Sequence, residues 1–166
     1  SLEAQISSIS DDIAYNSHDL EDGLNAKLFH LNDLMEIPML LDIVKKHRKR
    51  IKNYNQELIE RQIVRETINE MVKDIIINTK KNLLKYKIKN INDVYKNKNL
   101  IVCFSPSMNL FDLSVKSFLK NRMYYNKNVL RKTNRGKMII KKLFLIIKKK
   151  PNKYIKKEDM FNKSKE

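Results

Sequence analysis

The sequence predicts an all-α fold, and three observations lead to this prediction. Apolar residues recur at every third or fourth position through most of the chain, which is the spacing of one side of an α-helix. The chain of 166 residues has only two glycines and three prolines, the residues that most often interrupt helices. One short run, residues 100–104, is rich in β-branched and aromatic side chains. We expect an extended segment there and no sheet, because nothing nearby offers a second strand.

The first predicted helix covers residues 1–23 and ends near Gly23, which would form a C-terminal cap or a bend. At about 100° per residue, its apolar side chains fall on one side. These are Leu2, Ile6, Ile9, Ile13, Leu20 and Leu24. The opposite side is polar and carries Asp11, Tyr15, His18, Asp19 and Asp22.

The next stretch is predicted to supply core residues and two further helices. We expect Leu24, Leu28, Phe29, Leu31 and Leu34 in the core. A second helix starts at Pro38, with Met39, Leu40, Ile43 and Val44 on one side, and ends in a basic run that suits a helix C-terminus. A long amphipathic helix covers residues 55–86. On it, Glu57 and Arg61 are expected to attract each other and Glu66 and Glu70 to repel each other.

The last third of the chain is predicted to contain a loop and two more helices. Residues 90–99 are polar and are expected to form the loop. The helix at 110–124 would be capped by Ser107 or Asn109. Its inward side chains would be Phe111, Leu113, Val115, Phe118, Leu119 and Met123. For residues 129–148 a buried helix with lysines reaching the surface is favoured over a helix on a membrane surface, and residues 152–166 are expected to be disordered.

The charge of the chain is strongly positive and unevenly distributed. The formal net charge of +16 divides into −3 for residues 1–50 and +19 for residues 51–166. Such an excess suits nucleic acid, a membrane surface or an anionic substrate. Abundant Lys, Asn and Ile also arise from A/T-rich codons, which is a competing explanation. The single Cys103 excludes a disulfide within the chain, and no signal peptide or membrane-spanning run is recognisable, so a cytoplasmic protein that does not enter membranes is expected.

The polar side of the first helix holds the candidate site. Asp11, Tyr15 and Asp19 are spaced i, i+4 and i+8, so two carboxylates and a phenol form one row. Such a row could hold a divalent metal at one end and a polar ligand, stacked on an aromatic ring, further along. The alternative is an ordinary solvated helix face, since a cation requires several ligands together.

The sequence SLEAQISSISDDIAYNSHDLEDGL resembles a motif of the bacterial deoxyguanosine triphosphate triphosphohydrolase-like enzymes, which are HD-domain metal phosphohydrolases. The resemblance continues through GLNAKLFHLNDLMEIP, ERQIVRETINEMVKDII, FSPSM and KSFLKNRMYYNKNV, and so covers roughly residues 1–150. It implies that Asp11 is the last of four metal ligands, that Tyr15 packs against the deoxyribose, and that Asp19 accepts a hydrogen bond from the sugar 3′-hydroxyl.

The resemblance covers only the C-terminal part of the family pattern. In the family, a His and a His-Asp pair upstream of such a segment complete the metal site, so the chain is expected to be a fragment that is inactive alone. The pair His18-Asp19 is not interpreted as that motif, because Asp19 occupies the sugar position, and neither His30 nor His47 is followed by Asp. Asn126 stands where the family usually has a His.

These observations lead to an expected organisation. Residues 1–35 would be the last portion of an HD-type catalytic core, residues 36–150 a phosphohydrolase-associated helical region, and residues 151–166 a basic tail. Arg61 and Arg65 share a face of the long helix, where they either meet a triphosphate or are exposed helix charges.

The family's reaction is implied as the first hypothesis for the function. A water activated by Mg²⁺, Mn²⁺ or another transition metal would split a deoxynucleoside triphosphate into a deoxynucleoside and tripolyphosphate. Homo-oligomers are also implied by the family. Two alternatives stay open: a basic helical nucleic-acid-binding module, whose affinity would fall steeply with salt, and a purely structural helical piece.

Overall fold

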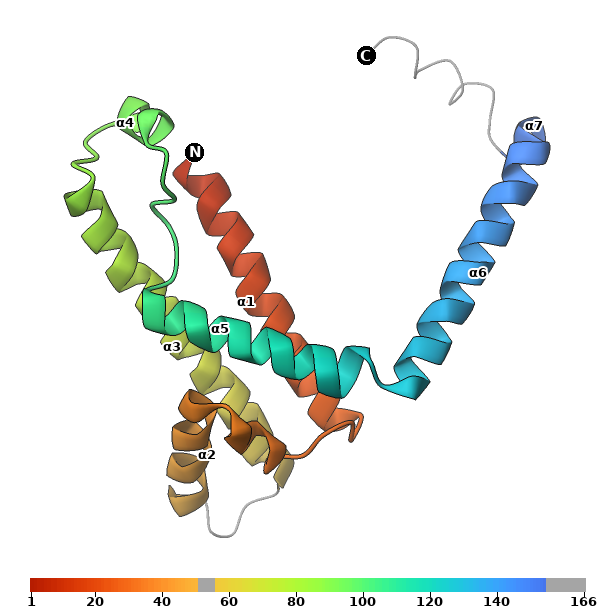
Figure 1. The fold of residues 1–166 in the computed structure, drawn as a ribbon, viewed down its shortest axis with the longest axis horizontal. Coiled ribbons are helices and arrows are strands. Elements are labelled where there is room, and N and C mark those ends of the chain that lie inside the picture. Colours follow the sequence, from red (N-terminus) through yellow and green to blue (C-terminus); the bar gives the residue numbers. More distant parts are fainter. Residues whose placement is uncertain (51–55, 155–166) are drawn as a thin grey trace. The chain divides into compact units, whose positions relative to one another are not determined.

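The structure is a computed structural model that describes residues 1–50 and 56–154 of the chain. Within these ranges every regular element is a helix, which confirms the predicted all-α fold (Figure 1). The chain forms two compact units, Ser1–Tyr124 and Tyr125–Glu166, and each is described by itself.

The first unit contains the candidate site and the hydrophobic core. Its elements are α1 (Leu2–Asn25), η1 (Asp33–Glu36), α2 (Pro38–Arg50), α3 (Gln56–Lys85), α4 (Ile91–Lys96), α5 (Pro106–Leu119) and η2 (Lys120–Tyr124). Helix α1 packs against both α3 and α5, and α2 packs against α3. Their apolar stripes meet in one core, which holds α1 against α3 and α5.

Helix α1 buries Ile13, Leu20 and Leu24, as its periodicity predicts. Helix α1 ends at Asn25, near Gly23 as predicted, but its C-cap is Ala26 and not Gly23. Gly23 instead allows the ring of Phe29 to approach the helix. A Cβ added at Gly23 would lie 2.2 Å from the Phe29 Cε1 atom.

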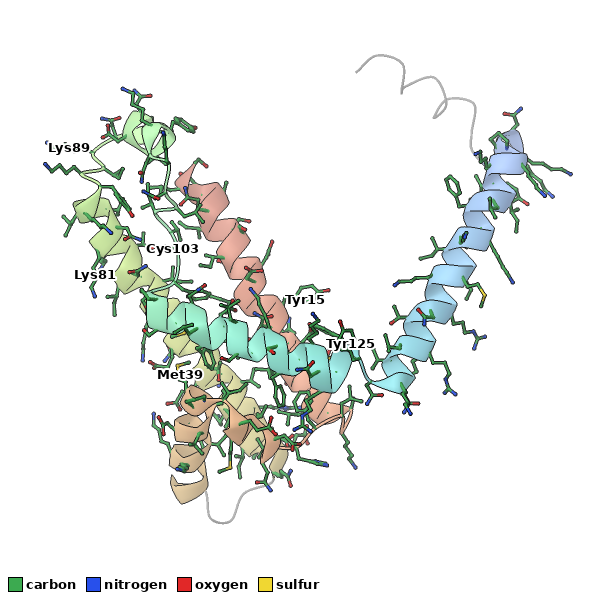
Figure 2. All side chains as sticks on the ribbon, viewed as in Figure 1. Tyr15, Met39, Lys81, Lys89, Cys103 and Tyr125 are labelled. Atoms are coloured by element: carbon green, nitrogen blue, oxygen red, sulfur yellow. The ribbon has the colours of Figure 1, made fainter. Side chains whose placement is uncertain are left out.

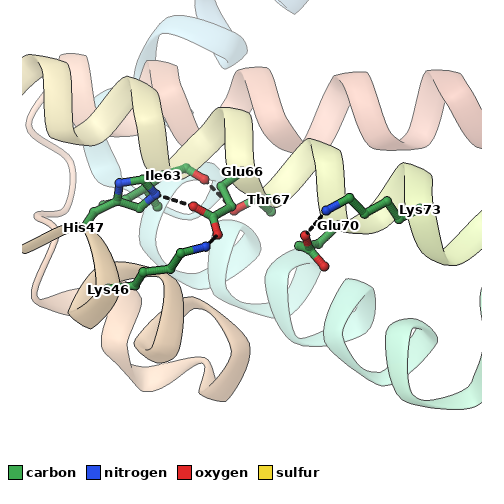
Figure 3. A network of polar contacts seen from close by, with 7 residues as sticks. All are labelled: Lys46, His47, Ile63, Glu66, Thr67, Glu70 and Lys73. Carbon is green, nitrogen blue, oxygen red and sulfur yellow. Dashed lines mark hydrogen bonds and ion pairs between the residues drawn. The ribbon is translucent and has the colours of Figure 1, made fainter. Parts of the chain in front are cut away.

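An ion-pair network joins α2 to α3 and changes how the charges on α3 interact. The Glu66 carboxylate contacts both Lys46 Nζ and His47 Nε2, and Glu70 pairs with Lys73 at 2.8 Å (Figure 3). Each of the two glutamates therefore has a cationic partner that offsets the repulsion expected between them. The predicted attraction between Glu57 and Arg61 is confirmed at 2.7 Å.

This network predicts a pH-dependent contribution to stability. The hydrogen bond from Lys46, with a further one from His47, holds the pKa of Glu66 below its usual value of 4.5. A carboxyl with a lowered folded-state pKa stabilises the fold above its unfolded pKa, and this stabilisation is lost as the pH falls below about 4.5. We expect Glu66→Gln to lower the free energy of unfolding by about 1–2 kcal/mol at pH 6 and by clearly less at pH 3. Urea unfolding of both proteins at the two pH values measures this, and an equal loss at both would contradict it.

The polar loop predicted for residues 90–99 contains a short helix, α4 (Ile91–Lys96). Asn90 Oδ1 accepts hydrogen bonds from the Asn92 and Asp93 backbone N–H groups, and the Asp93 carboxylate accepts one from the Asn90 N–H. This reciprocal arrangement is a capping box, which nucleates even a short helix.

Helix α5 begins earlier than predicted, and its cap is Ser105 rather than Ser107 or Asn109. Ser105 Oγ accepts from the Met108 N–H at 3.3 Å and donates to Asp74 of α3 at 2.6 Å. The preceding residues 100–104 form no strand, and the chain bends at residues 101–102. Leu113, predicted to point inward, is 53% exposed, because α5 packs through a face that passes through Phe111, Val115, Phe118 and Leu119.

The second unit contains α6 (Lys127–Lys149) and α7 (Pro151–Tyr154). Asn126 is the N-cap of α6, since its side chain accepts from the Asn128 N–H at 3.0 Å. Taken by itself, the second unit does not bury α6 as predicted, because none of the residues of this helix is buried there. Residues 152–154, predicted to be disordered, lie in α7, and the remainder of the predicted tail lies outside the described residues. None of the described helices is long and apolar enough to cross a membrane.

Candidate functional site

The three predicted site residues lie in one row on α1, each about one helical turn from the next. Asp11 is exposed at one end of the row and Asp19 is half-buried at the other. Tyr15, labelled in Figure 2, lies between them and is 71% exposed. An exposed phenol ring between two carboxylates offers a flat apolar surface beside hydrogen-bond acceptors.

The structure adds a fourth residue to the candidate site, Tyr124 of η2, which lies beside this row. Its hydroxyl donates a short hydrogen bond to Asp19 Oδ2. Partial burial, the hydrogen bond to Asp19 and the charge of Asp19 all raise the pKa of Tyr124, so the phenol stays protonated and remains a donor at neutral pH. A carboxylate has two oxygens with several acceptor positions, so Asp19 held in this way can still accept a bond from a ligand.

Tyr124 reaches Asp19 because the chain leaves α5 through a π-helical turn, η2. A π turn adds a residue per turn relative to an α-helix and so changes the direction of the side chains that follow it. Arg122 of the same turn pairs with Glu36 of η1 at 2.5 Å. Sequence reasoning did not identify Tyr124 as a site residue, although the Met123-Tyr124 pair lies within a segment that carries the family resemblance.

A buried polar cluster fixes α1 against α5 next to the site. Asn16 Nδ2 donates to Asp112 Oδ1 at 2.8 Å, and Lys116 Nζ lies 2.8 Å from Asp112 Oδ2 and 3.5 Å from Asp12. Burial works against the charge of Lys116, but the contacts with Asp112 and Asp12 outweigh it and raise the pKa of Lys116. The cluster borders a pocket of about 500 Å³ between the start of α1, residues 100–104 and α5. It holds the helix that carries the site residues in register.

The residues present do not by themselves fit a metal site. Asp11 is exposed, and no group of three or more His, Cys, Asp or Glu side chains gathers among residues 1–50 and 56–154. His18 and His30 are exposed, and His47 is engaged with Glu66. A stable site for a divalent cation requires several ligands together, so Asp11 would need partners from outside the described residues.

The two arginines considered for triphosphate binding differ in their surroundings. Arg61 pairs with Glu57 at 2.7 Å and lies 4.0 Å from Glu21 of α1. Arg65 is exposed, one turn further along α3. The carboxylates beside Arg61 give it a structural role that requires no phosphate.

Comparison with known proteins agrees with the resemblance seen in the sequence. Residues 102–162 match the family described as "Phosphohydrolase-associated domain". The chain is 51% identical over 162 residues to the deoxyguanosinetriphosphate triphosphohydrolase-like protein of Pelagibacter ubique, covering 98% of this chain and 44% of that protein. Proteins of the same name from Bartonella tribocorum and Rickettsia typhi are 37% and 36% identical over 86% and 88% of this chain, and over 36% and 38% of their own lengths.

The chain thus spans less than half the length of these curated relatives. The similarity includes α1 with its polar row as well as the helices that follow it, since it covers nearly the whole chain in the Pelagibacter protein. The chain is therefore similar, over nearly its whole length, to part of the deoxyguanosinetriphosphate triphosphohydrolase-like proteins, and it carries a match to the phosphohydrolase-associated domain.

Proposed function

We propose that this chain forms part of an enzyme that splits a deoxynucleoside triphosphate into a deoxynucleoside and tripolyphosphate. The observation that carries the proposal is the Asp19 carboxylate, oriented by Tyr124 and lying one turn from the exposed ring of Tyr15. A fixed acceptor beside an aromatic surface is the arrangement that a deoxyribose requires, because the sugar has one apolar side and a hydroxyl donor. The family name of the relatives supports the same substrate class.

Each residue of the row then has a distinct role. Asp19 accepts a hydrogen bond from the 3′-hydroxyl of the sugar, and Tyr124 holds its carboxylate in place. The ring of Tyr15 packs against the sugar and crowds the 2′ position, so a 2′-hydroxyl is disfavoured. This assignment predicts a preference for deoxyribonucleotides over ribonucleotides.

Asp11 is proposed as one ligand of a divalent metal ion, with the other ligands supplied by residues outside this chain. By itself the chain is expected to be inactive. We also propose that residues 1–35 belong to an HD-type catalytic core and residues 36–150 to the associated helical region, with a basic tail after them. Assembly into homo-oligomers belongs to the same proposal.

The test uses a chimera in which the matched part of the Pelagibacter ubique protein is replaced by this chain. We expect the chimera to release deoxyguanosine from dGTP in the presence of Mn²⁺. Asp19→Ala should lower kcat/KM for dGTP by about 10²-fold or more, because the sugar hydroxyl loses a charged acceptor. Asp11→Ala should abolish turnover.

Asp22→Ala is the matched control, since Asp22 is an exposed aspartate one turn beyond the row on the same helix. It should leave kcat/KM within about twofold of the unmodified chimera. Equal activity of the Asp19 and Asp22 variants would exclude the proposed sugar contact. Salt-sensitive binding to nucleic acid, with an affinity that substitution of Asp11 or Asp19 does not change, would instead favour the basic nucleic-acid-binding module.

A further inference from the structure

An aliphatic groove runs between the first half of α1 and the middle of α3, on the side of α1 opposite the polar row. We define this aliphatic groove by Ile6, Ile9 and Ile13 of α1 and Val72, Ile75 and Ile76 of α3. Its volume is about 320 Å³. Ile6 is 51% exposed, Ile76 50% and Val72 41%, so the groove is open to solvent within the first unit.

The aliphatic groove continues the hydrophobic core. Further along the same two helices, Leu20 and Leu24 of α1 and Ile63 and Val64 of α3 are almost completely buried in that core. The apolar stripes of α1 and α3 extend past the part that the unit covers. Exposure of aliphatic surface to water is unfavourable, and contiguous exposed patches often mark interaction sites.

The polar groups beside the groove are few. The Thr79 hydroxyl lines the groove, is buried from solvent, and has no hydrogen-bond partner among the residues that the structure describes. Lys80 lies at the edge of the groove. An occupant with an aliphatic stripe and an acidic group near Lys80 would complement the groove.

The longer relatives contain polypeptide that could provide such an occupant. The Pelagibacter ubique protein contains the counterparts of both α1 and α3, and more than half of its length lies outside the match. In that relative, the additional polypeptide and the counterparts of the two helices therefore belong to one protein. A second copy of this chain is the competing occupant, and the labelling experiment below distinguishes the two.

We propose that the aliphatic groove docks a helix from the polypeptide that the longer relatives carry outside the matched region. Docking there would fix the added polypeptide to the helix that carries Asp11, Tyr15 and Asp19. The proposal deepens the proposed function and rests on it, since it specifies where the two parts of one catalytic unit join.

The test measures the accessibility of the groove with a single reactive thiol. Cys103→Ser removes the only native cysteine, and Ile76→Cys then places a thiol in the groove. We expect maleimide to label this thiol rapidly in the chain alone and at least about tenfold more slowly in the chimera with the Pelagibacter ubique protein. Ile6→Cys provides a second probe on the opposite wall, in case one variant fails to give a folded helical protein.

Leu84→Cys is the matched control, because Leu84 lies on the same helix, outside the groove, and is 81% exposed. Its labelling should be equally fast in the chain and in the chimera. Equal labelling of both groove thiols in the two proteins would overturn the proposal. So would protection in the chain alone that increases with protein concentration, since a second copy would then occupy the groove.

The outcome is independent of catalysis. Protection of the groove in a folded chimera that does not hydrolyse dGTP would keep the docking surface and reject the proposed function. Hydrolysis of dGTP without protection of either groove thiol would support the proposed function and reject the docking surface.

Discussion

Replacing Phe29 with alanine is expected to lower the free energy of unfolding by about 3–5 kcal/mol. The Phe29 side chain is buried, and its ring centroid lies 4.9 Å from that of Phe118 in an edge-to-face arrangement. Removal of the ring loses this contact and leaves a cavity against α1. Urea denaturation followed by circular dichroism measures the loss, and Leu84→Ala should change stability by less than about 0.5 kcal/mol.

The same contact predicts that the effect of Gly23→Ala changes sign with its background. In the native protein the new methyl group would overlap the buried Phe29 ring, and we expect a loss of about 1–3 kcal/mol. In the Phe29→Ala background the space is free, and the helix propensity of alanine should stabilise the protein by up to about 1 kcal/mol. A double-mutant cycle tests this coupling. Additive effects of the two substitutions would show that contact with the Phe29 ring is not the reason why residue 23 is a glycine.

Asp112→Ala is the second substitution with a large expected effect, about 2–4 kcal/mol of lost stability. The Asp112 carboxylate is buried between α1 and α5 and accepts from Asn16 while it pairs with Lys116. Without it, the Asn16 amide is left buried without its acceptor. Lys116 is partly exposed and can turn to Asp12 or to water, so the loss stays below that of a fully buried ion pair.

A matched pair of variants separates this mechanism from a simple loss of packing. Asp112→Asn keeps the shape and an acceptor oxygen, so it should cost clearly less than Asp112→Ala in urea denaturation. Asn16→Leu combined with Asp112→Leu removes both polar partners, and we expect this pair to be more stable than Asp112→Leu alone. If the double variant is the less stable one, the buried amide is not the source of the loss.

Features that depend on neighbours along the chain were predicted well. The 3.6-residue period located α1, α2, α3 and most of α5 and α6, and it identified Ile13, Leu20 and Leu24 as core residues. The pair Glu57 and Arg61 formed as expected from its spacing. The wrong predictions of where helices begin concerned their N-terminal caps. The capping box of α4 and the Ser105 cap of α5 depend on a few hydrogen bonds that a periodicity argument does not include.

The polar row of α1 was also predicted from the sequence, because spacing along one helix places Asp11, Tyr15 and Asp19 on one face. The roles of the three residues stay predictions until the chimera is assayed. The burial predicted for α6 is not found within the second unit, because an apolar stripe requires a covering partner and does not specify one.

What the sequence by itself determined is therefore the helical class, the row of three residues and the resemblance to the triphosphohydrolase-like proteins. Only the tertiary structure showed that Tyr124 holds Asp19 across 105 residues of sequence, that Glu66 pairs with α2, and that Asp112 joins α5 to α1. The physical reason is that helix periodicity is a local property of consecutive residues. Contacts between helices depend on how the helices cross and on turns such as η2, which no spacing along the chain reveals.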